Sequence, residues 1–110
     1  MYGYSHICEE IKGFKKVFVI GNTREKRNIF CIELGNGEKC AVFAAAFHGL
    51  EYLTATALME FAKKFRDTPK LQDRLKLFVV PMVNPDGVEI AINGVNPKNP
   101  YHRDIIKHTG

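Results

Sequence analysis

The chain has 110 residues, of which 45% are hydrophobic and 25% charged, a composition that indicates one globular domain and excludes a disordered, collagen-like or coiled-coil protein. Its 16 basic and 12 acidic residues give a net charge of +4 and are scattered, so we expect no nucleic-acid partner. No run approaches the ~20 apolar residues that span a bilayer, and residues 1–16 lack the apolar core of an export signal. We therefore expect a cytoplasmic protein without membrane contact.

The first half of the chain predicts three strands. Residues 16–21 form a short apolar run, residues 22–28 form a polar turn, and residues 29–34 and 39–47 form two further apolar runs. Residues 35–38 (Gly-Asn-Gly-Glu) join the last two runs, and Asn-Gly tolerates the positive φ of a tight turn. We therefore expect a β-hairpin made of residues 29–47.

The three cysteines do not have the spacing of a zinc-binding motif. Cys31 and Cys40 flank the expected hairpin, and Cys8 makes the count odd. In a chain without an export signal we expect all three to be reduced thiols.

The second half begins with the clearest helix, at residues 51–66. Apolar residues recur there at intervals of three and four and predict one buried face, made of Leu53, Ala57, Leu58, Phe61 and Phe65. Pro69 ends the helix, because proline disfavours helical geometry in the residue before it.

A nearly continuous apolar run follows at residues 75–83, which is typical of a strand covered on both faces. Residues 84–87 (Asn-Pro-Asp-Gly) predict a turn, and residues 88–92 predict another short strand. Residues 93–100 read as a loop, and the remainder is polar.

A buried strand requires cover on both faces, but the sequence contains only one long helix. We expect that residues 1–110 are the N-terminal portion of a larger domain, apparently truncated. We also expect self-association through an exposed sheet edge that buries residues 77–83 and their neighbours.

His48 and Glu51 are the strongest candidates for chemistry. His48 lies at the carboxyl end of an expected strand and Glu51 at the start of the next helix, where open α/β sheets place their ligand sites. A neutral imidazole nitrogen and a carboxylate oxygen suit zinc, and Gly49 permits a sharp bend between them. The pair has an alternative interpretation, because glutamate is favoured in the first turn of any helix and histidine often packs before one.

A second motif strengthens the zinc interpretation. His48-Gly49-Leu50-Glu51, a helix, and then an apolar strand that ends in Asn84-Pro85-Asp86-Gly87 together resemble the zinc carboxypeptidase family over essentially the whole chain. Residues from 93 onward look more like the bacterial branch that includes γ-D-glutamyl-L-diamino acid endopeptidases of cell-wall peptides than like the digestive enzymes.

The resemblance implies an α/β fold, a mixed β-sheet with flanking helices of the phosphorylase/hydrolase-like kind. It implies that His48 and Glu51 are the first two ligands of one zinc ion, and that Asn84, Pro85, Asp86 and Gly87 form a structural turn beside the site. Leu50 stands where the digestive enzymes often carry a substrate-binding arginine, so that contact is absent here.

Other parts of the family's site have no counterpart before Gly110. These are the arginines that hold the substrate carboxylate, the third ligand histidine, a tyrosine and the general-base glutamate, all expected beyond residue 110. His6, His102 and His108 are the only local substitutes for the third ligand, and we expect surface or packing roles for them.

The resemblance implies a zinc-dependent peptidase that hydrolyses a peptide bond near a free carboxylate, and a weak or absent metal and little activity in this chain alone. One alternative is a zinc deacylase of the aspartoacylase type, which assays on N-acyl amino acids would reveal. The other is a non-catalytic binding or assembly module, in which the histidine and glutamate only cap and pack and zinc has no effect on stability.

Overall fold

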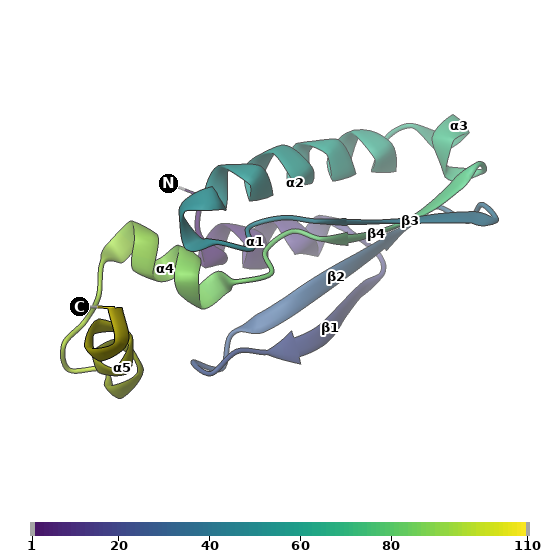
Figure 1. Ribbon diagram of the computed structural model, residues 1–110. Coiled ribbons are helices and arrows are strands. Elements are labelled where there is room, and N and C mark those ends of the chain that lie inside the picture. The colour runs from purple at the N-terminus through teal and green to yellow at the C-terminus, as the bar shows by residue number, and fades with distance from the viewer. Residues whose placement is uncertain (1, 110) are drawn as a thin grey trace.

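The computed structural model describes residues 2–109 as a four-stranded sheet with helices on one face and at one end, with extents of 50 × 23 × 21 Å (Figure 1). In chain order the elements are α1 (Tyr4–Glu10), the 3-10 turn η1 (Ile11–Gly13), β1 (Val17–Asn22), β2 (Asn28–Leu34), β3 (Lys39–Ala44), the 3-10 turn η2 (Gly49–Glu51), α2 (Tyr52–Arg66), α3 (Pro69–Gln72), β4 (Leu75–Val80), α4 (Pro85–Asn93) and α5 (Pro100–Thr109). The predicted mixed sheet with flanking helices is confirmed.

The sheet has the strand order β1-β2-β4-β3. β1 and β2 form an antiparallel hairpin, and β2 is also antiparallel to β4. β3 and β4 are parallel, with Ala41 beside Leu77 and Ala44 beside Val80, and α2 lies in the crossover between them. The strands predicted at residues 16–21, 29–34, 39–47 and 75–83 are therefore all present, although β3 and β4 each end three residues early.

The predicted hairpin between residues 29–34 and 39–47 is wrong, because β4 lies between these two strands. The connecting segment reverses the direction of the chain but does not place β3 next to β2. It crosses the start of β4 instead, where Asn36 N donates to Gln72 O (2.8 Å) and Gly37 N to Leu75 O (3.4 Å). The glycines are needed for this close crossing, since a Cβ on Gly37 would lie 2.2 Å from the carbonyl carbon of Arg74.

The buried face of α2 also differs from the predicted one. Phe65 is buried as predicted, but Ala55, Met59 and Ala62 pack into the core beside it, whereas Leu53 is 68% exposed. Together with Ile7 of α1, these residues cover Ile32 of β2 and Val79 of β4. Ala55 and Ala62 on the buried face allow the helix to pack close to the sheet.

The opposite face of the sheet carries apolar side chains that remain accessible. Phe43 of β3 contacts Phe61 of α2, so the preceding Val42 points to the other face, where it is 69% exposed. The open edges belong to β1 and β3. Residues 77–83 are not at an edge, because β4 occupies the interior of the sheet.

The predicted strand at residues 88–92 is wrong, because these residues lie within α4. Asn84 is the N-cap of this helix, and its side-chain oxygen accepts a hydrogen bond from Gly87 N (2.9 Å). Pro85 occupies the first turn, where its missing N–H costs nothing. Asn-Pro-Asp-Gly suits a tight turn and a helix start equally well, and here it starts a helix.

The polar tail after residue 100 forms α5 at the end of the molecule, below α4 in Figure 1. Asn99 precedes this helix, and its side-chain oxygen accepts a hydrogen bond from Tyr101 N (2.9 Å). The helices found in residues 2–109 are all too short or too polar to traverse a bilayer. Cys8, Cys31 and Cys40 are free thiols, and β4 separates the strands that carry the last two.

Candidate metal centre

The candidate site lies where the parallel strands β3 and β4 end, which is where α/β sheets open toward ligands. His48 follows β3, and Glu51 closes η2 directly before α2. The two side chains meet, with His48 Nδ1 3.0 Å from Glu51 Oε2. Both face solvent, at 81% and 46% exposure, so a metal ion has access to them.

The spacing of the two side chains suits zinc. Bonds of roughly 2.0–2.2 Å at a tetrahedral angle separate two ligand atoms by about 3.4 Å. The observed 3.0 Å is slightly shorter, and a small rotation of either exposed side chain would open the gap. The hydrogen bond with His48 lowers the pKa of Glu51, which keeps this carboxyl group ionised, as metal binding requires.

The backbone that leads into His48 is held in an unusual conformation. Ala46 has a φ of 55°, in the left-handed region that costs energy for any residue with a Cβ. Its N–H donates to Thr54 Oγ1 (3.0 Å), and its carbonyl accepts from Asn84 N (3.0 Å). Thr54 in turn donates to Glu51 O (2.6 Å), so one hydroxyl joins the chain before the histidine to the turn that carries the glutamate.

The first turn of α4 packs directly against the segment 47–51, called the metal turn below. Asn84 Nδ2 donates to Phe47 O (3.3 Å). Gly49 lies so close to Gly87 that a Cβ on Gly49 would be 2.2 Å from the carbonyl oxygen of Gly87. The absence of a Cβ on Gly49 therefore allows the contact that places both motifs side by side, although the two glycines are 38 positions apart in the sequence.

The side chain of Asp86 contacts a different part of the chain, the turn between β1 and β2 (residues 23–27). It is 3% exposed, and it accepts hydrogen bonds from Thr23 Oγ1 (2.8 Å), Glu25 N (3.2 Å) and Arg27 Nη1 (2.8 Å). Burial alone would lower the pKa of Arg27, but the hydrogen bonds to Asp86 and Glu25 outweigh it and raise that pKa.

Comparison with known families agrees with this arrangement, since the zinc carboxypeptidase family model matches residues 4–105. The chain belongs to the zinc carboxypeptidase family. A curated relative, the γ-D-glutamyl-L-diamino acid endopeptidase 1 of Lysinibacillus sphaericus, is 32% identical over 84% of this chain. The chain spans only 28% of the length of that relative.

Solved structures show the same fold at lower identity. The carboxypeptidase A of Helicoverpa armigera superposes with a TM-score of 0.66, at 19% identity, over 83% of this chain and 24% of its own. A metallo-carboxypeptidase from Burkholderia cenocepacia superposes with a TM-score of 0.64, at 19% identity, over 99% of this chain and 38% of its own. The chain therefore has part of the zinc carboxypeptidase fold.

Residues 2–109 contain no group of three histidine, cysteine, aspartate or glutamate side chains that would hold a metal, so the candidate pair has no third such partner there. Each other histidine has a local partner. His6 Nδ1 accepts from Gly3 N (3.0 Å), His102 Nδ1 accepts from Asn96 N (2.8 Å), and His108 Nδ1 lies 2.7 Å from Asp104 O. Of the ligand residues that the zinc carboxypeptidase family implies, the described part of the chain offers His48 and Glu51.

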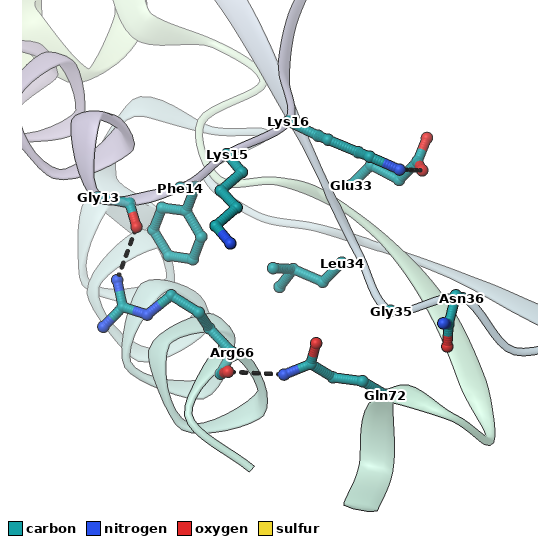
Figure 2. A pocket seen from close by; sticks show the side chains of 10 residues that line it. All are labelled: Gly13, Phe14, Lys15, Lys16, Glu33, Leu34, Gly35, Asn36, Arg66 and Gln72. Carbon is teal, nitrogen blue, oxygen red and sulfur yellow. Dashed lines mark hydrogen bonds and ion pairs between the residues drawn. The ribbon is translucent and has the colours of Figure 1, made fainter. Parts of the chain in front are cut away.

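Of two hollows on the described surface, one adjoins the His48–Glu51 pair and the other lies far from it. A groove of about 380 Å³ begins at the metal turn and is lined by Gly49, Leu50, Asn84, Gly87, Ile90, Ala91, Tyr101 and Ile105. The other, of about 430 Å³, lies at the opposite end of the sheet (Figure 2). There Lys16 pairs with Glu33, and Arg66 donates to Gly13 O. Lys15 points into the space between these two pairs (Figure 2). This second hollow is separate from the metal centre.

Sequence reasoning found the two candidate ligands but missed their supports. Thr54 gave no signal, because a threonine one turn into a helix has many uses. Arg27 and Thr23 belong to a segment that reads only as a polar turn. The only hint that Asp86 has a specific partner was its position as the one charged residue of the Asn-Pro-Asp-Gly segment.

Proposed function

We propose that this chain carries the first two zinc ligands, His48 and Glu51, of a peptidase that hydrolyses a peptide bond near a free carboxylate. The observation that carries the proposal is the 3.0 Å contact between the two side chains at the carboxyl ends of parallel strands. The zinc carboxypeptidase family model spans both motifs, which supports the same role.

The chemistry follows from the two side chains. Glu51 supplies an ionised carboxylate, and His48 supplies Nδ1 on the side that faces Glu51. When bound, zinc polarises the scissile carbonyl group and acidifies a water molecule. The hydroxyl of Thr54 joins the strained backbone of Ala46 to the carbonyl of Glu51, and so orders the turn that carries both side chains.

The proposed substrate class is a peptide with a γ-D-glutamyl-L-diamino acid bond, of the kind found in cell-wall peptides. Its support is the name of the curated relative and the 32% identity over 84% of this chain. Leu50 at the mouth of the groove leaves this position without a cation for a substrate carboxylate.

The 110 residues alone are proposed to be inactive. Catalytic zinc sites use three protein ligands and a water molecule, whereas the described residues provide two ligands. General-base and electrostatic groups are each worth roughly 10²-fold or more in rate, and the family's versions of these groups have no counterpart here. Peptide hydrolysis by this chain, abolished by a chelator, would contradict this part of the proposal.

Zinc titration of the chain tests the ligand assignment. We expect His48→Ala and Glu51→Gln each to weaken zinc affinity at least ~10-fold, because loss of one of two ligands leaves a single donor. His108→Ala is the matched control, since that histidine is exposed and bonds only within α5. Equal affinities for the wild-type chain and both ligand variants would overturn the assignment.

A further inference from the structure

Asp86 is a buried carboxylate that does not belong to the candidate metal pair. Both of its oxygens are used by one short segment, because Oδ1 accepts from Thr23 and Arg27 and Oδ2 accepts from the backbone of Glu25. A buried charge is tolerated only when it is paired and hydrogen-bonded, and here an arginine, a hydroxyl and an N–H supply those partners. The segment 23–27 is thereby fixed to the first turn of α4.

The first turn of α4 is also the part of the molecule that touches the metal turn. Asp86 lies between Asn84, which donates to Phe47 O, and Gly87, whose carbonyl fills the space beside Gly49. This turn therefore contacts the backbone on both sides of His48, at Phe47 and at Gly49. The β1–β2 turn is therefore linked to the metal turn through the first turn of α4.

The same β1–β2 turn also holds the segment that leads into α5. Arg27 Nη1 binds Glu25 as well as Asp86, at 2.9 Å. Glu25 accepts a hydrogen bond from the side chain of Asn99 and lies 3.4 Å from His102 Nε2. Burial alone would raise the pKa of Glu25, but these contacts outweigh it and lower that pKa. The five side chains Glu25, Arg27, Asp86, Asn99 and His102 form one connected network.

We propose that Asp86 is a positioning residue for the metal centre: through Arg27 and Thr23 it fixes the first turn of α4, which in turn fixes the separation of His48 and Glu51. This inference rests on the proposed function, because it assigns Asp86 a role in the affinity of that pair for zinc. A role confined to fold stability would also explain a buried ion pair, so the test must separate the two.

The experiment compares three variants of the 110-residue chain by zinc titration and thermal unfolding. Asp86→Asn removes the charge with little change in shape, and Thr23→Val is a milder variant that removes one donor to Asp86. Glu10→Gln is the matched control. It removes a partly buried ion pair with Lys63 (3.0 Å), which lies 12 residues along the chain from Glu51, about 18 Å along the helix.

Loss of a group that orients a metal ligand typically costs ~10-fold or more in metal affinity. We expect Asp86→Asn to weaken zinc affinity by about that factor, Thr23→Val by a smaller one, and Glu10→Gln to lower the melting temperature without changing zinc affinity. A lower melting temperature for Asp86→Asn with unchanged zinc affinity would overturn the inference.

A second measurement keeps the inference separate from the proposed function. If the wild-type chain and His48→Ala bind zinc with equal affinity, the metal assignment fails. Hydrogen exchange of the Glu51 amide then tests the positioning role of Asp86. That amide donates to His48 O (2.9 Å) within the metal turn. Selectively faster exchange there in Asp86→Asn supports the positioning role, and exchange that is unchanged or faster everywhere overturns it.

Discussion

Gly49→Ala provides the sharpest structural test of how the two motifs meet. A Cβ at position 49 would lie 2.2 Å from the carbonyl oxygen of Gly87 and 2.6 Å from its carbonyl carbon. Both distances are far below van der Waals contact, and both neighbours are backbone atoms that cannot rotate away. Gly87 is itself held by the Asn84 cap (2.9 Å), so relief requires α4 to move away from the metal turn.

Overpacking of a well-packed region costs roughly 1–3 kcal/mol, and we expect Gly49→Ala to lie at the upper end, about 3 kcal/mol, because only backbone can yield. For a domain of this size that corresponds to a fall in melting temperature of roughly 10 °C or more. Urea unfolding measures the free energy directly. Gly21→Ala is the control, because its Cβ would lie 3.7 Å from Ile29 Cδ1, an ordinary contact. If the two variants differ by less than about 0.5 kcal/mol, the close approach of the two turns is not as described.

Three further predictions concern other parts of the chain. Lys26 has a φ of 64° in the β1–β2 turn, so Lys26→Gly should raise the free energy of unfolding by ~0.5–1 kcal/mol, and a lower value in urea unfolding would contradict the strain. The depressed pKa of Glu51 contributes stability that is fully present above its ordinary value of 4.5 and lost as the pH falls through the lower folded value. Unfolding free energies measured at about pH 6 and about pH 3 should therefore differ less in His48→Ala than in the wild type, and an equal difference would refute the interaction. We propose that two copies of the chain pair through the open edge of β3, a strand whose Val42 is 69% exposed on the face away from α2. Light scattering should show an assembly that Val42→Lys dissociates, and a wild-type monomer at tens of micromolar would disprove it.

Four of the five predicted strands are present, the fifth (residues 88–92) is helical, and the neighbours of the strands were predicted poorly. Each of the four runs of apolar residues forms a strand, because strand formation is encoded in local composition. Pairing is not local: residues 35–38 resemble a hairpin turn, yet they bridge across β4, which lies some 40 residues later in the chain. Only the tertiary contacts of Asn36 and Gly37 with the start of β4 distinguish the two outcomes.

The buried face of a helix likewise depends on tertiary contacts. The spacing indicated a buried stripe made of Leu53, Ala57, Leu58, Phe61 and Phe65. Phe65 is buried as predicted and Leu58 is partly buried against the core, but the rest of the buried face is Ala55, Met59 and Ala62. The sheet selects the face that approaches most closely, and the two alanines on that face carry little weight in a pattern that counts large apolar residues. For the candidate site, the sequence pointed to the ligand pair through its placement between strand and helix. It did not point to Arg27 or Thr23, whose role depends on partners about 60 residues away.

The imidazole of His48 and the carboxylate of Glu51 are proposed to bind one zinc ion together. Anomalous diffraction from crystals of the chain grown with zinc tests it most directly. We expect a peak between His48 Nδ1 and the Glu51 carboxylate, at about 2.0–2.2 Å from each, with water completing the coordination. Zinc bound elsewhere on the chain, with these two side chains still hydrogen-bonded only to each other, would contradict it.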